Sequence, residues 1–175
     1  MAIKPDRRLE ASALWDLAVR LLAGRAHTSA EIRSKLRRRA GRAQDVEAVL
    51  GRLRNAGYLD EHGFAESFAA ARLENQHHGR MRVLQDLRRR GVAPALAAAS
   101  VEKAYRETDE LALIEDFIRR RLKPEEGAFR ERKDFAAAYR KLLRAGFSSS
   151  NSLAVLKKFA RDPDLAEGYD EIGSS

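Results

Sequence analysis

Apolar residues recur along the chain at the spacing of α-helices. Leu14, Leu17, Ala18, Leu21 and Leu22 lie three or four positions apart, which places them on one face of a helix. Similar stripes occur at 32–36, 46–53, 64–71, 84–87, 97–104, 111–122, 135–143 and 153–160. Ala, Leu and Arg dominate over the β-branched residues, which disfavours strands. The pattern predicts an all-α protein with nine short helices.

Capping residues agree with these helices. Thr28 followed by Glu31 is typical of a capping box at the start of the second helix, and Asp60 suits the start of the fourth helix. The acids Asp109 and Glu110 stand where a helix begins, as the helix dipole favours. Glycine follows four helical stretches, where a left-handed residue is expected, at Gly41, Gly57, Gly91 and Gly146.

A short sequence recurs and indicates tandem repeats. LRRRAG at 36–41 returns as LRRRG at 87–91, and LLRAG at 142–146 is a weaker echo. We predict three three-helix repeats at 10–58, 59–106 and 107–161, followed by an acidic, disordered tail at 162–175. Because so small a unit buries little surface alone, neighbours should pack in a line. The expected architecture is an elongated, curved array of helix-turn-helix-like units.

The charge is strongly positive outside the tail. The chain has 34 Lys and Arg against 26 Asp and Glu, and five of these acids lie in 162–175. Without these five, 21 acids face 34 bases, a charge of +13. Residues 20–56 hold ten bases and three acids. This distribution favours a polyanion or an acidic protein surface as the partner.

Arginine clusters define the candidate binding residues. Three arginine clusters, at 37–39, 88–90 and 119–121, stand near the C-terminal ends of predicted helices. The helix dipole stabilises cations at these ends, so a single cluster could be there for stability alone. Three clusters in so basic a chain favour a continuous basic face. The predicted binding residues are Arg33, Lys35, Arg37, Arg38, Arg39, Arg42, Arg88, Arg89 and Arg90.

Catalytic and metal-binding patterns are absent from the sequence. There is no cysteine, which excludes a disulfide scaffold, a thiolate zinc site and a cysteine nucleophile. His77 and His78 are neighbours, so on a helix they would not share a ligand face. The chain has no phosphate-binding glycine loop and no nucleophile elbow. We expect no catalytic residues, no metal and no cofactor.

The segment GYLD at 57–60 joins the first two predicted repeats. Gly57 would end one helix, Asp60 would cap the next, and Tyr58 and Phe64 would pack into the core between repeats. A direct role of Tyr58 in partner binding is the alternative. No apolar stretch resembles a membrane span or a secretory signal, so we expect a soluble, cytoplasmic protein.

Several segments together resemble the RecX family of bacterial recombination regulators. They are LLAGR at 21–25, SAEIRSKL at 29–36, VEAVL at 46–50, GYLD at 57–60, FA at 64–65, GR at 79–80 and LQDLRRRGV at 84–92. The similarity runs from about residue 10 to 122 and is looser to 161. Order, spacing and length agree with the family, whose members also contain three-helix tandem repeats.

The resemblance implies a non-catalytic regulator of the RecA recombinase, acting in DNA repair, recombination and the SOS response. RecX-like proteins bind the RecA filament on DNA and mainly inhibit its ATPase, strand-exchange and co-protease activities. The expected partners are the RecA filament and, weakly and without specificity, single- and double-stranded DNA, with the protein a monomer. The alternative is a helix-turn-helix DNA-binding protein acting in transcription, which three-helix units also suggest.

Overall fold

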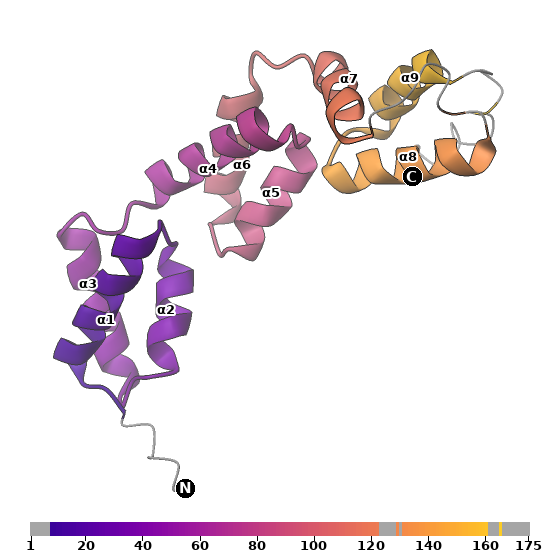
Figure 1. Ribbon diagram of the computed structural model, residues 1–175. Helices are drawn as coiled ribbons and strands as arrows, with labels where there is room; N and C mark the ends of the chain where they lie inside the picture. The colour runs from indigo at the N-terminus through magenta and orange to yellow at the C-terminus, as the bar shows by residue number, and fades with distance from the viewer. Residues whose placement is uncertain (1–7, 123–128, 130, 161–164, 166–175) are drawn as a thin grey trace, which may run out of the picture. The chain divides into compact units, whose positions relative to one another are not determined.

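The chain folds into α-helices, as the sequence predicts. A computed structural model describes residues 8–122, 129, 131–160 and 165, and within them there is no β-strand, only isolated bridges from Leu9 to Ala40 and from Phe129 to Ala160. The nine helices of the described residues are α1 (Ala11–Gly24), α2 (Ser29–Arg37), α3 (Ala43–Asn55), α4 (Glu61–Gln76), α5 (Arg80–Arg89), α6 (Pro94–Tyr105), α7 (Glu110–Arg121), α8 (Arg132–Ala145) and α9 (Ser149–Phe159) (Figure 1).

By its contacts the chain divides into two compact units. The first unit contains residues 1–67 and 87–97, and the second contains 68–86 and 98–175. The repeat boundaries predicted at 58/59 and 106/107 fall in the turns before α4 and before α7. The division into three repeats stays a prediction, and the tail at 162–175 lies outside the described residues except for Leu165.

The core of the first unit lies between α1, α2 and α3, which pack on one another (Figure 1). Leu14, Ile32, Leu36, Leu50 and their neighbours in this core are completely buried. They occupy the predicted apolar stripes, so the helical spacing alone determines which face of each helix turns inward. The opposite face of α2 is left for charged residues.

The helix starts follow the predicted caps. Glu31 N–H donates to Thr28 Oγ1 at 3.1 Å and Thr28 N–H donates to Glu31 Oε2 at 3.3 Å, which completes the capping box. Asp60 Oδ1 accepts from Gly63 N–H at 2.9 Å. Asp109 caps α7 by accepting from Leu111 N–H at 2.9 Å. These contacts satisfy backbone donors that a helix end leaves without partners.

Left-handed residues follow the prediction in three places and differ in two. Gly57, Gly91 and Gly146 have φ of 74°, 81° and 91°. Gly41 was expected among them and is not, because its N–H donates to Leu9 O at 3.0 Å beside the Leu9–Ala40 bridge. Within the described residues the fourth left-handed position is instead His77, with φ of 55°, which follows the end of α4 at Gln76.

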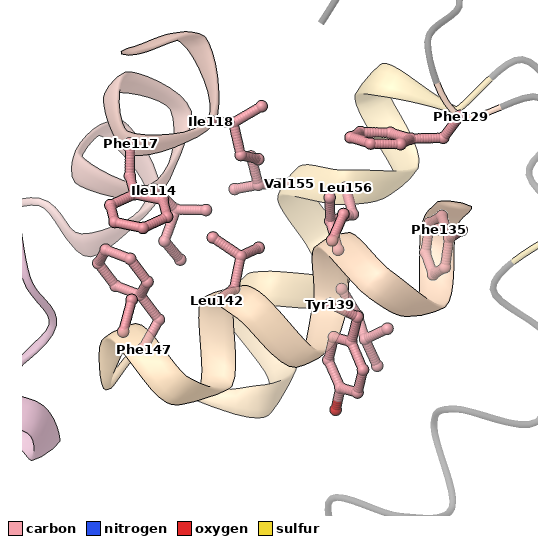
Figure 2. Close-up of a cluster of buried hydrophobic side chains, with 13 residues drawn as sticks. Ile114, Phe117, Ile118, Phe129, Phe135, Tyr139, Leu142, Phe147, Val155 and Leu156 are labelled. Atoms are coloured by element: carbon pink, nitrogen blue, oxygen red, sulfur yellow. The ribbon is translucent and has the colours of Figure 1, made fainter. Parts of the chain in front are cut away.

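Aromatic rings fill the core formed by α7, α8 and α9 in the second unit. Figure 2 shows Phe117 and Phe147 meeting edge to face, with ring centroids 5.4 Å apart, and Leu142 pointing from α8 into the space between α7 and α9. Edge-to-face pairs stabilise a core beyond the area that they bury. Phe117 thereby holds the last turn of α7 in place.

Two helix starts are docked against the end of another helix. In the first unit, Thr28 Oγ1 donates to Arg90 O at 2.6 Å, and a Cβ on Gly91 would overlap Ala30. In the second unit, Gly79 N–H donates to Ala145 O at 2.8 Å, and a Cβ on Gly146 would overlap the Arg82 backbone. Each contact joins the start of one helix to the left-handed glycine after another.

Three glycine-to-alanine substitutions in the first unit separate backbone strain from steric overlap. Gly51→Ala, in open space within α3, should raise the free energy of unfolding by about 0.5–1 kcal/mol. Gly57→Ala adds only the left-handed cost and should lower it by about 1–2 kcal/mol. Gly91→Ala adds the overlap with Ala30 and should lower it by about 3 kcal/mol or more. Urea unfolding measures all three, and equal losses at Gly57 and Gly91 would contradict the close packing.

Candidate functional site

The exposed face of α2 carries the candidate site. Ala30, Ser34 and Arg38 are spaced by four residues and form one stripe along the helix. On one side of this stripe lies a hollow of about 380 Å³, here called the basic groove, lined by Arg25, Ala30, Glu31, Ser34, Lys35, Arg38, Arg89, Arg90 and Gly91. On the other side a hollow of about 390 Å³ is lined by Ala30, Arg33, Ser34, Arg37 and Arg38.

The end of α5 reaches the basic groove through the docked turn at Gly91. Thr28 holds the carbonyl of Arg90, and the small residues Ala30 and Gly91 allow the two backbones to approach. The Arg90 side chain then turns toward α2: its Nε donates to Glu31 Oε1 at 3.0 Å, and its guanidinium lies 5.0 Å from the centre of the Phe64 ring. Two arginine clusters far apart in the sequence therefore share one groove.

Glu31 is the one acid that lines the basic groove. Besides Arg90 it contacts Arg25, whose Nη1 lies 3.4 Å from Glu31 Oε2. Burial raises the pKa of Glu31, but the hydrogen bond from Arg90, the Arg90 charge, the Thr28 N–H and the Arg25 charge together lower it below 4.5. Glu31 is therefore ionised at neutral pH. With five bases and one ionised acid in its lining, the groove carries a charge of +4.

Histidine adds no charge to the groove near neutral pH. His27 is buried behind Arg25, and its Nδ1 lies 2.9 Å from Arg25 O. Burial lowers the pKa of His27 below 6.5, with further lowering by the charges of Arg25 and Lys35; the hydrogen bond to the Arg25 carbonyl and the charge of Glu31 act in the opposite direction. The charge of the groove thus comes from arginine and lysine.

The structure brings six of the nine predicted binding residues around α2. Lys35, Arg38, Arg89 and Arg90 line the basic groove, while Arg33 and Arg37 line the hollow beside it. The remaining three lie elsewhere: Arg39 follows α2 and its carbonyl accepts from Leu9 N–H, Arg42 is the N-cap of α3, and Arg88 is exposed but lines neither hollow.

Two of these six residues are arginines whose side chains are held by carboxylates. Arg33 makes a bidentate pair with Glu47, with distances of 2.9 Å from Nε and 3.1 Å from Nη2. Arg37 approaches the same carboxylate at 3.6 Å. Arg90 is bound to Glu31, as described above. Arg33 and Arg90 therefore position the surface, while Lys35 and Arg38 are exposed on it.

Sequence reasoning missed Arg25 and Glu31 as groove residues. Arg25 was recognised only as part of the local charge excess, and Glu31 only as the capping acid. The signal that could have identified Glu31 is its position in the capping box. A carboxylate at this position lies over the start of the helix, where it caps Thr28 N–H and also accepts a hydrogen bond from Arg90.

Gly57 and Asp60 have the conformation and the capping contact expected at the junction, but Tyr58 is not buried. Gly57 is left-handed, Asp60 caps α4, and Phe64 lies under the Arg90 guanidinium. Tyr58 is 50% exposed, and its ring meets Trp15 edge to face at 6.0 Å. The expected burial of Tyr58 was therefore wrong: the ring packs against the outside of α1 instead.

Other kinds of site find no support in the described part of the chain. Among those residues no group of three or more His, Asp or Glu side chains is arranged to hold a metal ion. None of the helices that the structure describes combines the length and apolar character needed to cross a membrane. The basic groove is a site of another kind, because its arginine and lysine donors suit phosphate or carboxylate oxygens.

The fold and the groove define a small all-α protein that contains three-helix bundles and carries a basic surface groove. Models of two domains of one family match the chain: "RecX, first three-helix domain" at residues 15–53 and "RecX, second three-helix domain" at residues 60–100. These matches cover most of α1–α3 and most of α4–α6.

Known relatives agree over longer stretches. The chain is 37% identical over 156 residues to "Regulatory protein RecX" of Halorhodospira halophila, covering 89% of this chain and 92% of that protein. It is 35% identical over 165 residues to the protein of the same name from Deinococcus radiodurans, covering 92% and 76%. The chain belongs to the RecX family. The crystal structure of RecX from Lactobacillus salivarius has the same fold, with a TM-score of 0.62 at 17% identity over 85% of this chain and 96% of that one.

The charge of Glu31 should contribute to stability in a pH-dependent way. Glu31→Gln keeps the capping hydrogen bonds but removes the charge, and should lower the free energy of unfolding at pH 7 by about 1–2 kcal/mol. Because the pKa of Glu31 is lowered by folding, the wild-type advantage is complete above pH 4.5 and is lost as the pH falls further. Urea unfolding between pH 7 and pH 3 measures this difference.

Glu47→Gln is the matched control for this prediction. It removes one carboxylate from an exposed ion pair with Arg33, where solvent screens the interaction, so its effect should be smaller. A loss in Glu31→Gln that stays constant down to pH 3 would show that the charge of Glu31 is not the cause.

Proposed function

We propose that this protein binds the RecA recombinase filament on DNA and inhibits it. It acts by occupying the filament, without catalysing a reaction, and so lowers ATP hydrolysis, strand exchange and co-protease activity in DNA repair, recombination and the SOS response. Membership of the RecX family supports this proposal, since the relatives are named as regulatory proteins. The expected protein is a cytoplasmic monomer that also binds DNA weakly and without sequence preference.

The observation that carries the proposal is the meeting of two arginine clusters in the basic groove. Five bases around one acid give a local charge of +4 within about 380 Å³. Guanidinium groups bind phosphate and carboxylate oxygens in pairs, so such a groove suits both a DNA backbone and an acidic protein surface. A nucleoprotein filament offers both kinds of oxygen together.

The groove residues divide into positioning residues and contact residues. Arg90 is held by Glu31, so its main effect is to fix the groove wall. Lys35 is exposed on the last turn of α2, Arg38 is exposed at the C-cap of this helix, and Arg89 is exposed on the opposite wall. We assign partner contact to these three residues because they reach outward, and because a rigid support lowers the entropy cost of binding.

A helix-turn-helix DNA-binding protein in transcription is the second candidate. The three-helix bundle α1–α3 favours it, because such bundles occur in DNA-binding modules. The two candidates differ in a simple way: a filament regulator prefers recombinase-coated DNA over bare DNA, whereas a transcription factor protects a defined sequence.

Reversing the charge of the contact residues should weaken inhibition. Lys35→Glu/Arg38→Glu places two acids on the groove, and we expect about tenfold more protein to be needed for half-maximal inhibition. Inhibition should also depend less on salt, because fewer ion pairs remain to be screened. The measurement is ATP hydrolysis by RecA filaments on single-stranded DNA, titrated with wild type or variant at two salt concentrations.

The control reverses the same number of charges elsewhere in the first unit. Arg20→Glu/Arg54→Glu changes two exposed residues that do not line the basic groove, and should inhibit nearly as wild type does. The proposal fails if wild type leaves the ATPase unaffected, and the groove assignment alone fails if both double variants inhibit equally.

A further inference from the structure

A third hollow lies in the second unit and shares no residue with the two hollows beside α2. It encloses about 320 Å³ and is lined by Asn75, His77, Phe117, Arg120 and Arg121. Asn75 and His77 come from the end of α4 and the turn after it, and the other three come from the last two turns of α7. The Arg120 and Arg121 side chains belong to the arginine cluster at 119–121, which the proposed function does not use.

The backbone at His77 is held in a conformation that favours glycine. Its φ of 55° is left-handed, and the other left-handed residues in the described part of the chain are Gly57, Gly91 and Gly146. The turn is fixed on both sides: His77 N–H donates to Leu73 O at 3.1 Å, and Gly79 N–H donates to Ala145 O at 2.8 Å. A side chain at this position costs stability, which suggests that the imidazole itself has a use.

The surroundings of the hollow are positively charged. None of its lining residues is an acid, and Lys141 adds a further cation close by, since its Nζ donates to Arg121 O at 3.3 Å. The neighbouring His78 responds to this field. Burial lowers its pKa below 6.5, and the charges of Arg72, Arg82 and Arg121 lower it further, while Asp86 acts in the opposite direction.

Phe117 supplies the apolar part of the hollow's lining. Phe117 is only 5% exposed and packs against Phe147, so it presents a rigid apolar surface. Charged hydrogen bonds are stronger beside such a surface than in open water. Within the described residues, the third member of the cluster, Arg119, pairs with Glu115 at 3.7 Å, whereas Arg120 and Arg121 line the hollow.

We propose that this hollow binds phosphate groups of a nucleic-acid backbone, with Arg120, Arg121 and His77 as the donors. Arg120 and Arg121 are consecutive on α7, so their side chains leave the helix about 100° apart while both line the hollow, an arrangement that suits two successive phosphates of one chain. A polynucleotide is extended and carries a charge on every phosphate. The site deepens the DNA-binding part of the proposed function and rests on it: it adds a place of contact in the other unit, and this contact requires no recombinase.

The test is binding of the full chain to a fluorescently labelled single-stranded oligothymidylate, followed by anisotropy over a range of salt concentrations without recombinase. Arg120→Gln/Arg121→Gln should weaken binding about tenfold and lower the salt slope by about 1.4, the value for two lost phosphate contacts. His77→Gly should weaken binding about threefold, as expected for one lost hydrogen bond. Its thermal unfolding midpoint should be unchanged or higher, because glycine relieves the left-handed strain.

Two controls keep the result interpretable. Arg106→Gln/Arg140→Gln removes two exposed charges from the same unit and should change affinity by less than about twofold. The substitutions in the hollow are also introduced into the Lys35→Glu/Arg38→Glu variant. The fold-loss of oligonucleotide affinity should be the same there, because the hollow acts independently of the basic groove. If Arg120→Gln/Arg121→Gln loses no more affinity for the oligonucleotide than Arg106→Gln/Arg140→Gln does, the proposal is wrong.

Inorganic phosphate at matched ionic strength tests the other source of the same chemistry. If free phosphate raises the unfolding midpoint of wild type but not of Arg120→Gln/Arg121→Gln, while oligonucleotide affinity is unchanged, the hollow is a site for a small anion and the proposal is wrong. A strictly structural role of His77 is also excluded by the expected result, since His77→Gly should lose affinity without losing stability.

Discussion

The close approach of Gly91 to Ala30 is the constraint on which the basic groove depends. No larger side chain fits at Gly91, and the left-handed backbone there turns the carbonyl of Arg90 toward the Thr28 hydroxyl. Without this contact Arg89 and Arg90 would be ordinary exposed residues at a helix end. With it, they become one wall of a groove whose other wall is α2. The electrostatics of the site are thus a consequence of backbone packing.

The same device explains why the sequence repeats a motif that ends in glycine. In the second unit the backbone of Gly146 approaches Arg82 in the same manner, and the start of α5 donates to the end of α8. The first copy of the motif, LRRRAG at 36–41, has one additional alanine; Gly41 is not left-handed, and a Cβ there would make only ordinary contacts with Arg8 and Leu9. Similar sequence therefore gives similar helices, while the conformation after the helix depends on what packs there.

Local signals allowed most of the fold to be predicted, but only part of the site. Helix positions and caps depend on neighbours within four residues, so the apolar spacing and Thr28, Asp60 and Asp109 were sufficient. The groove depends on residues about 60 positions apart, such as Glu31 and Arg90, and no pattern within one helix reports such a contact. The strained turn at His77 was missed for the same reason, because its histidine stands where a glycine was the expected signal.

Neutralisation of the inner arginines bears on what the basic surface can select. Glu47 binds Arg33 and Glu31 binds Arg90, so the two arginines closest to the fold are already satisfied before any partner arrives. A partner that approaches the groove meets the outer cations first and then a fixed carboxylate, which repels anions that enter too deeply. Such a surface selects among anionic partners by the positions of its charges and not by its total charge. Under the proposed function, an anionic partner would be held by the outer cations Lys35, Arg38 and Arg89, while Glu31 would limit how deeply it enters the groove.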